Sequence, residues 1–276
     1  MDDQQSRHTP DPAVPAGAFA SRSEVWEERR KEQRGTVVRA ARGWHDARHR
    51  HAETGCVLAD GNRRSPAAAV FDALGSDYEK AFAASEAHRA SLAWLLERLP
   101  PGSRVLDVGS GTGRPTAATL AAAGHRVLGV DVSPVMVEIA SRQVPEAEFR
   151  RGDIRELPLE DGSLDAVCVY FALLQMSRAE QADLVRRLAL ALRPGGLFAL
   201  ATVPLDVEGF DGVFMGQDVR VTSFAAQAVT ALVREAGLTV LSEESVMFVP
   251  AHPDATPEPQ LFLHGRRGGG EAAPAG

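Results

Sequence analysis

The feature that most constrains the fold is an alternation of short apolar strands and helices that starts near Arg104 and continues almost to the C-terminus. The first predicted strand covers residues 104–108, and a helix over 115–123 follows it. Repeated strand and helix units predict a doubly wound, mostly parallel α/β sheet with helices on both faces. Further strands are predicted over 126–130, 148–150, 164–171, 196–203, 238–249 and 260–266, and further helices from 134, over 177–192 and over 224–236.

The first hundred residues have a different pattern. Ser65-Pro66 is a helix-start signal, and Leu92, Leu95, Leu96 and Leu99 recur at helical spacing before Pro100-Pro101-Gly102. The polar or small-residue segments 1–21 and 268–276 are typical of disordered tails. We therefore divide the chain into a tail (1–21), an N-terminal helical cap or lid (22–100), a main domain (101–267) and a second tail (268–276).

Composition excludes several classes of protein. The hydrophobic share of 44% and the charged share of 24% are those of a globular protein, and no apolar run reaches the roughly 18 residues of a membrane span. We expect a cytoplasmic protein without a signal peptide. Cys56 and Cys168 lie far apart, which favours free thiols over a disulfide, and no His/Cys cluster predicts a metal site.

The net charge of the chain limits the classes of partner that it can bind. The net charge of −7 argues against nucleic acid as a bulk partner. Residues 23–51 nevertheless carry many basic groups. We favour a solvated helix pair that covers the main domain or a partner in a homodimer; the alternative is a basic arm that docks RNA or protein.

Residues 105–116, VLDVGSGTGRPT, follow the first strand with Gly109, Gly111 and Gly113. Glycines here let the backbone turn sharply and approach a ligand. A dinucleotide site wants a third glycine where Arg114 stands, which argues against NAD and FAD.

Two acidic residues follow later strands. Asp131 ends the second strand, where a carboxylate can accept hydrogen bonds from ribose hydroxyls; the alternative is a helix-start acid before Ser133-Pro134. Asp153 follows the third strand and can accept from an adenine amino group, while Ile154 packs on the ring.

From about Phe71 to Arg267 the chain resembles the class I S-adenosylmethionine-dependent methyltransferases. The resemblance rests on VLDVGSGTG, GVDVSPVMVEIA, FRRGDIRELPLEDGSLDAV and LRPGGLFAL, in family order and spacing. It implies a Rossmann-like sheet of seven strands with the last antiparallel, and S-adenosylmethionine (SAM) as cofactor, with S-adenosylhomocysteine (SAH) as product. By resemblance, Asp107 orients the loop or contacts the amino acid end, the three glycines cradle the methionine part, Asp131 holds the ribose, and Val132 and Met136 flank the adenine. The full expected cofactor set is Asp107, Gly109, Ser110, Gly111, Thr112, Gly113, Asp131, Val132, Met136, Gly152, Asp153, Ile154 and Tyr170.

The acceptor side is less constrained. The cofactor's sulfonium is already activated, so a general base matters only for acceptors that lose a proton. Tyr78 matches a lid tyrosine of many relatives, or is a core tyrosine. Gln175 stands where close relatives often carry His, which leaves His88, or His45, His49 and His51, as bases; His264 is expected to be a sheet residue. The expected catalytic set is Tyr78, Gln175 and His88, and the expected substrate pocket contains Phe82, Phe171, Met215 and Gln217.

The leading hypothesis is transfer of a methyl group to a small apolar, aromatic or heterocyclic metabolite, at oxygen, nitrogen or carbon. An indole carbon would suit Gln175, because it needs no strong base. The segment 204–224, with Phe210, Phe214 and Met215, is expected to be an adaptable apolar wall. The alternatives are an RNA or protein methyltransferase that docks through the basic N-terminal helices, and a catalytically silent SAM-binding regulatory module.

Overall fold

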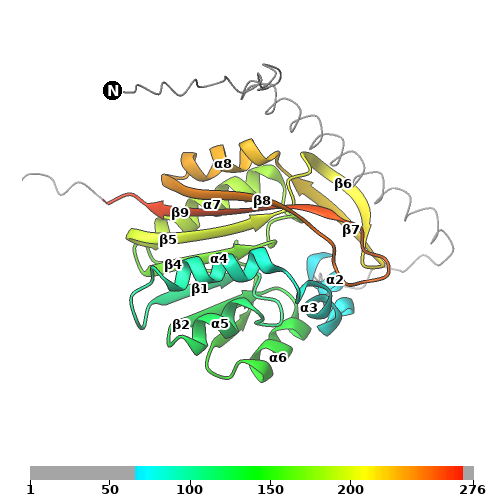
Figure 1. Cartoon of the computed structure of the whole chain (residues 1–276), viewed down its shortest axis with the longest axis horizontal. Helices are drawn as coiled ribbons and strands as arrows, with labels where there is room; N and C mark the ends of the chain where they lie inside the picture. The colour runs from blue at the N-terminus through cyan, green and yellow to red at the C-terminus, as the bar shows by residue number, and fades with distance from the viewer. Residues whose placement is uncertain (1–65, 270–276) are drawn as a thin grey trace, which may run out of the picture. The chain divides into compact units, whose positions relative to one another are not determined.

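The computed structural model describes residues 66–269. A seven-stranded sheet with the order β3-β2-β1-β4-β5-β9-β8 forms its centre (Figure 1). Only β9 runs antiparallel to its neighbours, β5 and β8, as the sequence analysis expected of the last strand. The strands are β1 (Arg104–Val108), β2 (Arg126–Asp131), β3 (Glu148–Arg151), β4 (Leu164–Tyr170), β5 (Leu192–Thr202), β8 (Leu238–Phe248) and β9 (Glu258–Arg267).

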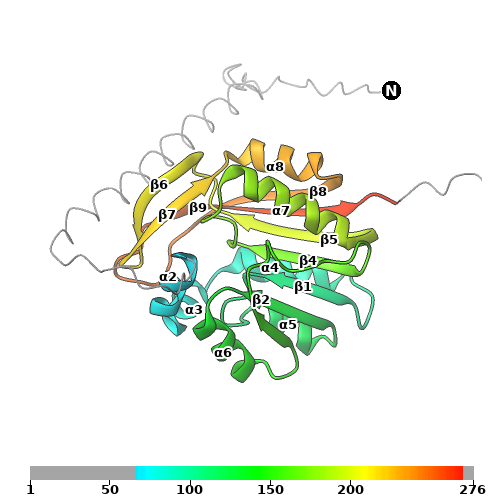
Figure 2. The same ribbon diagram turned by 180° about the vertical axis from the view of Figure 1, so that it is seen from behind.

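Helices cover both faces of this sheet. One face carries α4 (Glu86–Leu96) and α5 (Thr116–Ala122), with α6 (Pro134–Gln143) beside β2 and β3. The opposite face, seen from the front in Figure 2, carries α7 (Arg178–Ala191) and α8 (Ala226–Glu235). The doubly wound α/β prediction is confirmed.

Alternation along the strands produces the two core layers. In β4, Val167 and Val169 pack with α7 and α8, whereas Ala166 and Cys168 pack with α4 and α5. All four side chains are fully buried. A strand that is covered on both faces must be apolar at every position, which is why DAVCVY lacks the polar alternation of a surface strand. Cys168 is a buried free thiol, as predicted.

Segment 204–224, which was expected to be an adaptable apolar wall, contains strands that the sequence analysis did not predict. It contains a separate two-stranded ribbon of β6 (Val207–Phe214) and β7 (Gln217–Ser223). Met215 and Gly216 form the turn, with φ angles of 48° and 79°. Two positive φ values suit a tight hairpin, but a Met-Gly pair lacks the usual Asn-Gly or Asp-Gly signal.

The N-terminal part also differs from its prediction. The helix expected to start at Pro66 is broken at Gly75, which has φ 48°, into α2 (Pro66–Leu74) and α3 (Ser76–Phe82). The helix α4, which we had assigned to the cap, packs on the sheet through Leu92 and Leu95. The predictions for residues 1–65 and 270–276 lie outside the described residues. Within 66–269 no helix is long and apolar enough to cross a membrane.

Candidate functional site

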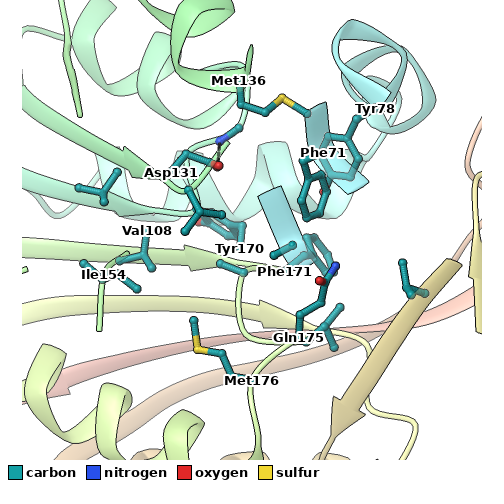
Figure 3. A pocket seen from close by; sticks show the side chains of 18 of the residues that line it. Phe71, Tyr78, Val108, Asp131, Met136, Ile154, Tyr170, Phe171, Gln175 and Met176 are labelled. Carbon is teal, nitrogen blue, oxygen red and sulfur yellow. Dashed lines mark hydrogen bonds between the residues drawn. The ribbon is translucent and has the colours of Figure 1, made fainter. Parts of the chain in front are cut away.

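A cavity of about 150 Å³ lies at the carboxyl ends of β1, β2 and β4. The strand order reverses here, because β2 and β3 lie on one side of β1 and β4 and β5 on the other. Such switch points are the usual ligand sites of doubly wound sheets. Figure 3 shows the cavity with side chains from the sheet and from α2 and α3 around it; its walls include Phe71, Tyr78, Val108, Asp131, Val132, Met136, Gly152, Asp153, Ile154, Tyr170, Phe171, Gln175 and Glu258.

The glycine-rich loop after β1 forms part of the wall, and its glycines have different roles. At Gly109, with φ 65°, an added Cβ would stand 2.5 Å from the Ala172 Cβ. At Gly111, with φ 52°, an added Cβ would meet nothing within 4 Å, so this position opens into the cavity. Gly113 lies outside the cavity walls, and an added Cβ would stand 2.9 Å from Phe149. It serves close packing, which corrects the expectation that all three glycines cradle a ligand.

Asp131 links this loop to the next helix. Its Oδ2 accepts a hydrogen bond from the Gly111 amide at 2.9 Å, and its Oδ1 accepts one from the Ser133 amide at 2.9 Å. The Ser133 hydroxyl in turn caps α6 by accepting from the Met136 amide. Burial raises the pKa of Asp131, while the backbone bonds oppose that rise. The alternative of a simple helix-start acid is therefore incomplete, because this carboxylate also fixes the glycine loop and lines the cavity.

Asp107 lies deeper and lacks full hydrogen bonding. Its Oδ2 and the Ser110 hydroxyl are buried, and neither has a partner within the described part of the chain. Burial, and then the charge of Asp131, raise the pKa of Asp107 to about 8. Asp107 and Ser110 line a second hollow, together with Thr112, and this hollow shares Gly109 and Gly111 with the first cavity. Buried acceptors without donors beside an open glycine fit a ligand that brings an ammonium group, as the methionine part of SAM does.

Beyond β3, Gly152, Asp153 and Ile154 reach the cavity as expected. The Asp153 carboxylate is held by Arg155, whose Nε and Nη2 donate to Oδ1 and Oδ2 at 3.0 and 2.6 Å. This pairing lowers the pKa of Asp153. Arg155 also lines the cavity, and its role was missed because a basic residue two positions after an acid is common on any surface.

Aromatic side chains form the opposite wall. Phe71, Tyr78 and Phe82 come from α2 and α3, and Tyr170 and Phe171 from the end of β4. Gln175 lines the same cavity as these rings (Figure 3). Of the expected catalytic residues, Tyr78 and Gln175 therefore meet at this cavity.

Other expected site residues lie elsewhere. His88 lines the second hollow, bonds Thr116 at 3.0 Å, and has a pKa lowered to about 4 by burial. Met215 is buried in the cluster beneath the β6–β7 ribbon, and neither it nor Gln217 lines the cavity. His264 lies within β9, where it bonds Ser91 and Ser242. The N-terminal histidines at positions 45, 49 and 51 are outside the described residues.

Glu258 is a cavity residue that the sequence analysis missed. It opens β9, is 4% exposed, and lines the same cavity as Tyr78. Burial raises its pKa to about 7. The surrounding sequence PEPQ has no strand alternation or motif spacing that could have indicated an inward carboxylate.

Comparison with known proteins agrees with this geometry. Residues 105–196 match a family model described as a methyltransferase domain. A demethylmenaquinone methyltransferase of Beutenbergia cavernae is 43% identical over 101 residues, 37% of this chain and 41% of that protein. Methyltransferase GfsG of Streptomyces halstedii is 31% identical over 189 residues, 61% of this chain and 66% of that protein.

A solved structure shares the fold. It is a Burkholderia thailandensis 1,6-didemethyltoxoflavin-N1-methyltransferase with bound 1,6-didemethyltoxoflavin and S-adenosylhomocysteine. Its TM-score is 0.55 at 24% identity, covering 77% of this chain and 93% of that one. The first curated relatives match over only 48%, 47% and 41% of their own lengths, so this chain spans less than half of each.

Proposed function

We propose that this chain, whose residues 105–196 match a methyltransferase-domain family model, is a class I SAM-dependent methyltransferase acting on a small molecule. The observation that carries the proposal is the glycine loop at the sheet's switch point. There Gly111 leaves open space beside the buried carboxylate of Asp131. The relatives named for menaquinone precursors and toxoflavin precursors support a small-molecule acceptor.

Different residues of the chain would bind different parts of SAM. We propose that Asp131 holds the ribose, that Asp107 and Ser110 accept from the amino acid end, and that Met136 and Ile154 flank the adenine. Each Asp131 oxygen accepts one backbone bond and has a further lone pair for a hydroxyl. When bound, SAM supplies an electrophilic methyl group on a positively charged sulfur. The protein's remaining task is to hold the acceptor in line and exclude water.

The acceptor would enter between the aromatic wall and Gln175. We propose that α2 and α3 cap this end of the cavity, since Phe71, Tyr78 and Phe82 come from them. Gln175 is a neutral amide that can orient an acceptor by hydrogen bonds but cannot remove its proton. The apolar surroundings favour an aromatic or heterocyclic acceptor of the kind found in secondary metabolism.

Titration calorimetry tests the cofactor first. SAM and SAH should bind with micromolar affinity, whereas NADH and FAD should not bind, because Arg114 stands where a dinucleotide fold needs glycine. Binding of NADH in place of SAM would overturn the proposal. Binding of SAM and SAH without turnover on any aromatic metabolite would instead favour a silent regulatory module. Turnover on RNA or protein that falls steeply with salt would favour docking by the basic N-terminal segment.

Replacing Asp131 by alanine should weaken SAH binding by about 1 to 3 kcal/mol, because hydrogen bonds to a charged acceptor are lost. The Gly111 amide also loses its partner, so the loop loosens. The measurement is calorimetry on both proteins. Asp161→Ala is the matched control, because Asp161 is exposed in a turn outside both hollows. Equal SAH affinity of Asp131→Ala and wild type would refute the ribose assignment.

A further inference from the structure

A buried carboxylate that has no cationic partner among residues 66–269 lines the cavity at the start of β9. Glu258 is 4% exposed, and the structure records one hydrogen bond to its side chain, from Gln260 Nε2 to Oε1 at 2.9 Å. No ion pair in residues 66–269 reaches it. A buried carboxylate is costly unless a positive charge or several donors compensate it. Gln260 supplies only one donor, so the compensation is incomplete.

Four aromatic rings share the cavity with this carboxylate. Phe71 meets Tyr78 edge-on at 5.5 Å between ring centroids, Tyr78 meets Phe82 at 4.9 Å, and Phe82 meets Phe214 at 6.1 Å. All four rings line the same walls as Glu258. Burial, and then the negative charge of Glu258, raise the pKa of Tyr78.

The backbone connects the carboxylate to these rings. Glu258 stands opposite Phe248 in the β8–β9 register, and Phe248 stacks on Phe82 with centroids 5.6 Å apart. The loop between the two strands is joined to α3 where the Ala251 amide donates to the Ala81 carbonyl at 2.9 Å. Glu258 is therefore linked, through Phe248 and this loop, to α3, the helix that carries Tyr78 and Phe82.

We propose that Glu258 and the rings of Phe71, Tyr78, Phe82 and Phe214, the carboxylate–aromatic site, bind a protonated amine carried by the methyl acceptor. Aromatic faces attract cations, and the attraction grows when water is excluded. A carboxylate among them adds a full negative charge where few donors compete for it. The inference rests on the proposed function and specifies its acceptor as an apolar molecule with an alkylammonium group.

The other charged side chains that line the cavity already have hydrogen-bond or ion-pair partners. Asp131 binds backbone amides near the glycine loop, and Asp153 is paired with Arg155. Arg155 is also paired with Glu180. The positive charge of Arg155 is therefore compensated locally, and Glu258 is the carboxylate on which an incoming cation can act. Burial raises the pKa of Glu258 to about 7. A bound ammonium favours the charged carboxylate, so it would lower this pKa again and hold Glu258 in its ionised form.

The test uses three probes that share one ring: phenethylammonium, phenethyl alcohol and phenylacetate, titrated into the full chain saturated with SAH at pH 7.5. Wild type should bind the ammonium at least about 10-fold more tightly than the alcohol, and the anion most weakly. Glu258→Gln keeps the shape and a polar amide, and should lose that preference. Glu244→Gln, on the exposed part of β8, is the matched control and should retain it.

Equal affinity for the ammonium and the alcohol in wild type, no measurable binding of the ammonium, or an unchanged preference in Glu258→Gln would each overturn the site.

A second experiment measures stability and needs no probe. Glu258→Gln should unfold at a higher urea concentration than wild type at pH 8 but not at pH 5, because a raised carboxyl pKa costs stability as the pH rises. A less stable variant at pH 8 would mean that the carboxylate is a structural bond, which also overturns the proposal. SAH binding is measured before the probe titrations and the unfolding experiment. Failure of SAH to bind would count against the proposed function.

Discussion

Replacing Gly111 by alanine should leave the protein folded while weakening SAH binding by roughly 100-fold or more, about 2.7 kcal/mol. The added Cβ meets no atom of residues 66–269 within 4 Å, so this part of the fold has room for it. That room is part of the cavity wall beside Asp131, where the proposed ligand must approach the backbone. Calorimetry with SAH measures the binding, and urea unfolding measures the stability.

The backbone angle needs its own control. Gly111 has φ 52°, and an L residue in this region costs about 1 to 2 kcal/mol of stability wherever it stands. Gly102 has φ 71° and also has nothing within 4 Å of an added Cβ, but it lies before β1, away from both hollows. Gly102→Ala should share the loss of stability and keep SAH affinity. Gly109→Ala is a poorer test, since its Cβ would clash with Ala172 and disturb the fold itself. If Gly111→Ala bound SAH as Gly102→Ala does, no ligand would approach this loop.

Much of the sheet was predictable because its signals are local. The apolar run at 105–108, the glycines after it and the acid at 131 follow one another along the chain, and the parallel topology brings them to one edge. The helix predicted over 177–192 likewise begins where expected, because Ser177 and Glu180 form a capping box at the start of α7. Where a residue's role depends on its immediate neighbours in sequence, pattern is sufficient.

The acceptor side depends on contacts between distant segments. Phe214 comes from a ribbon whose Met-Gly turn lacks a standard signal, and Glu258 opens β9 between two prolines. Phe214 was expected in an apolar wall, whereas Glu258 is not distinguished from a surface residue until β8, β9 and α3 are packed together. Met215 shows the converse error. It directly follows Phe214, which lines the cavity, but Met215 itself is buried in a neighbouring cluster.

Replacing Asp107 by asparagine should make the protein more stable at alkaline pH while weakening SAH binding. Burial raises the pKa of Asp107 to about 8 in the folded state, against 3.8 for an ordinary aspartate. The unfolded chain therefore releases this proton near pH 4, while the folded chain keeps it until about pH 8. The contribution is fully present below pH 4 and is lost as the pH rises through 8.

The loss should amount to roughly 2 to 4 kcal/mol between pH 5 and 8.5, at 1.36 kcal/mol per pKa unit. Urea unfolding at both pH values should show that decline in wild type and a much smaller one in Asp107→Asn. Glu258 titrates in both proteins, so its effect cancels in the difference. Asp161→Asn, an exposed change, should behave as wild type.

The same substitution should weaken SAH binding about 10-fold or more, since a carboxylate that accepts from an ammonium becomes a neutral amide. The two effects have one cause. Within residues 66–269 no donor reaches this buried carboxyl oxygen, which costs stability, and a bound ligand can supply the missing donor. Parallel pH dependence in wild type and Asp107→Asn would show that this oxygen is already satisfied in the free protein. Unchanged SAH affinity would remove Asp107 from the binding site.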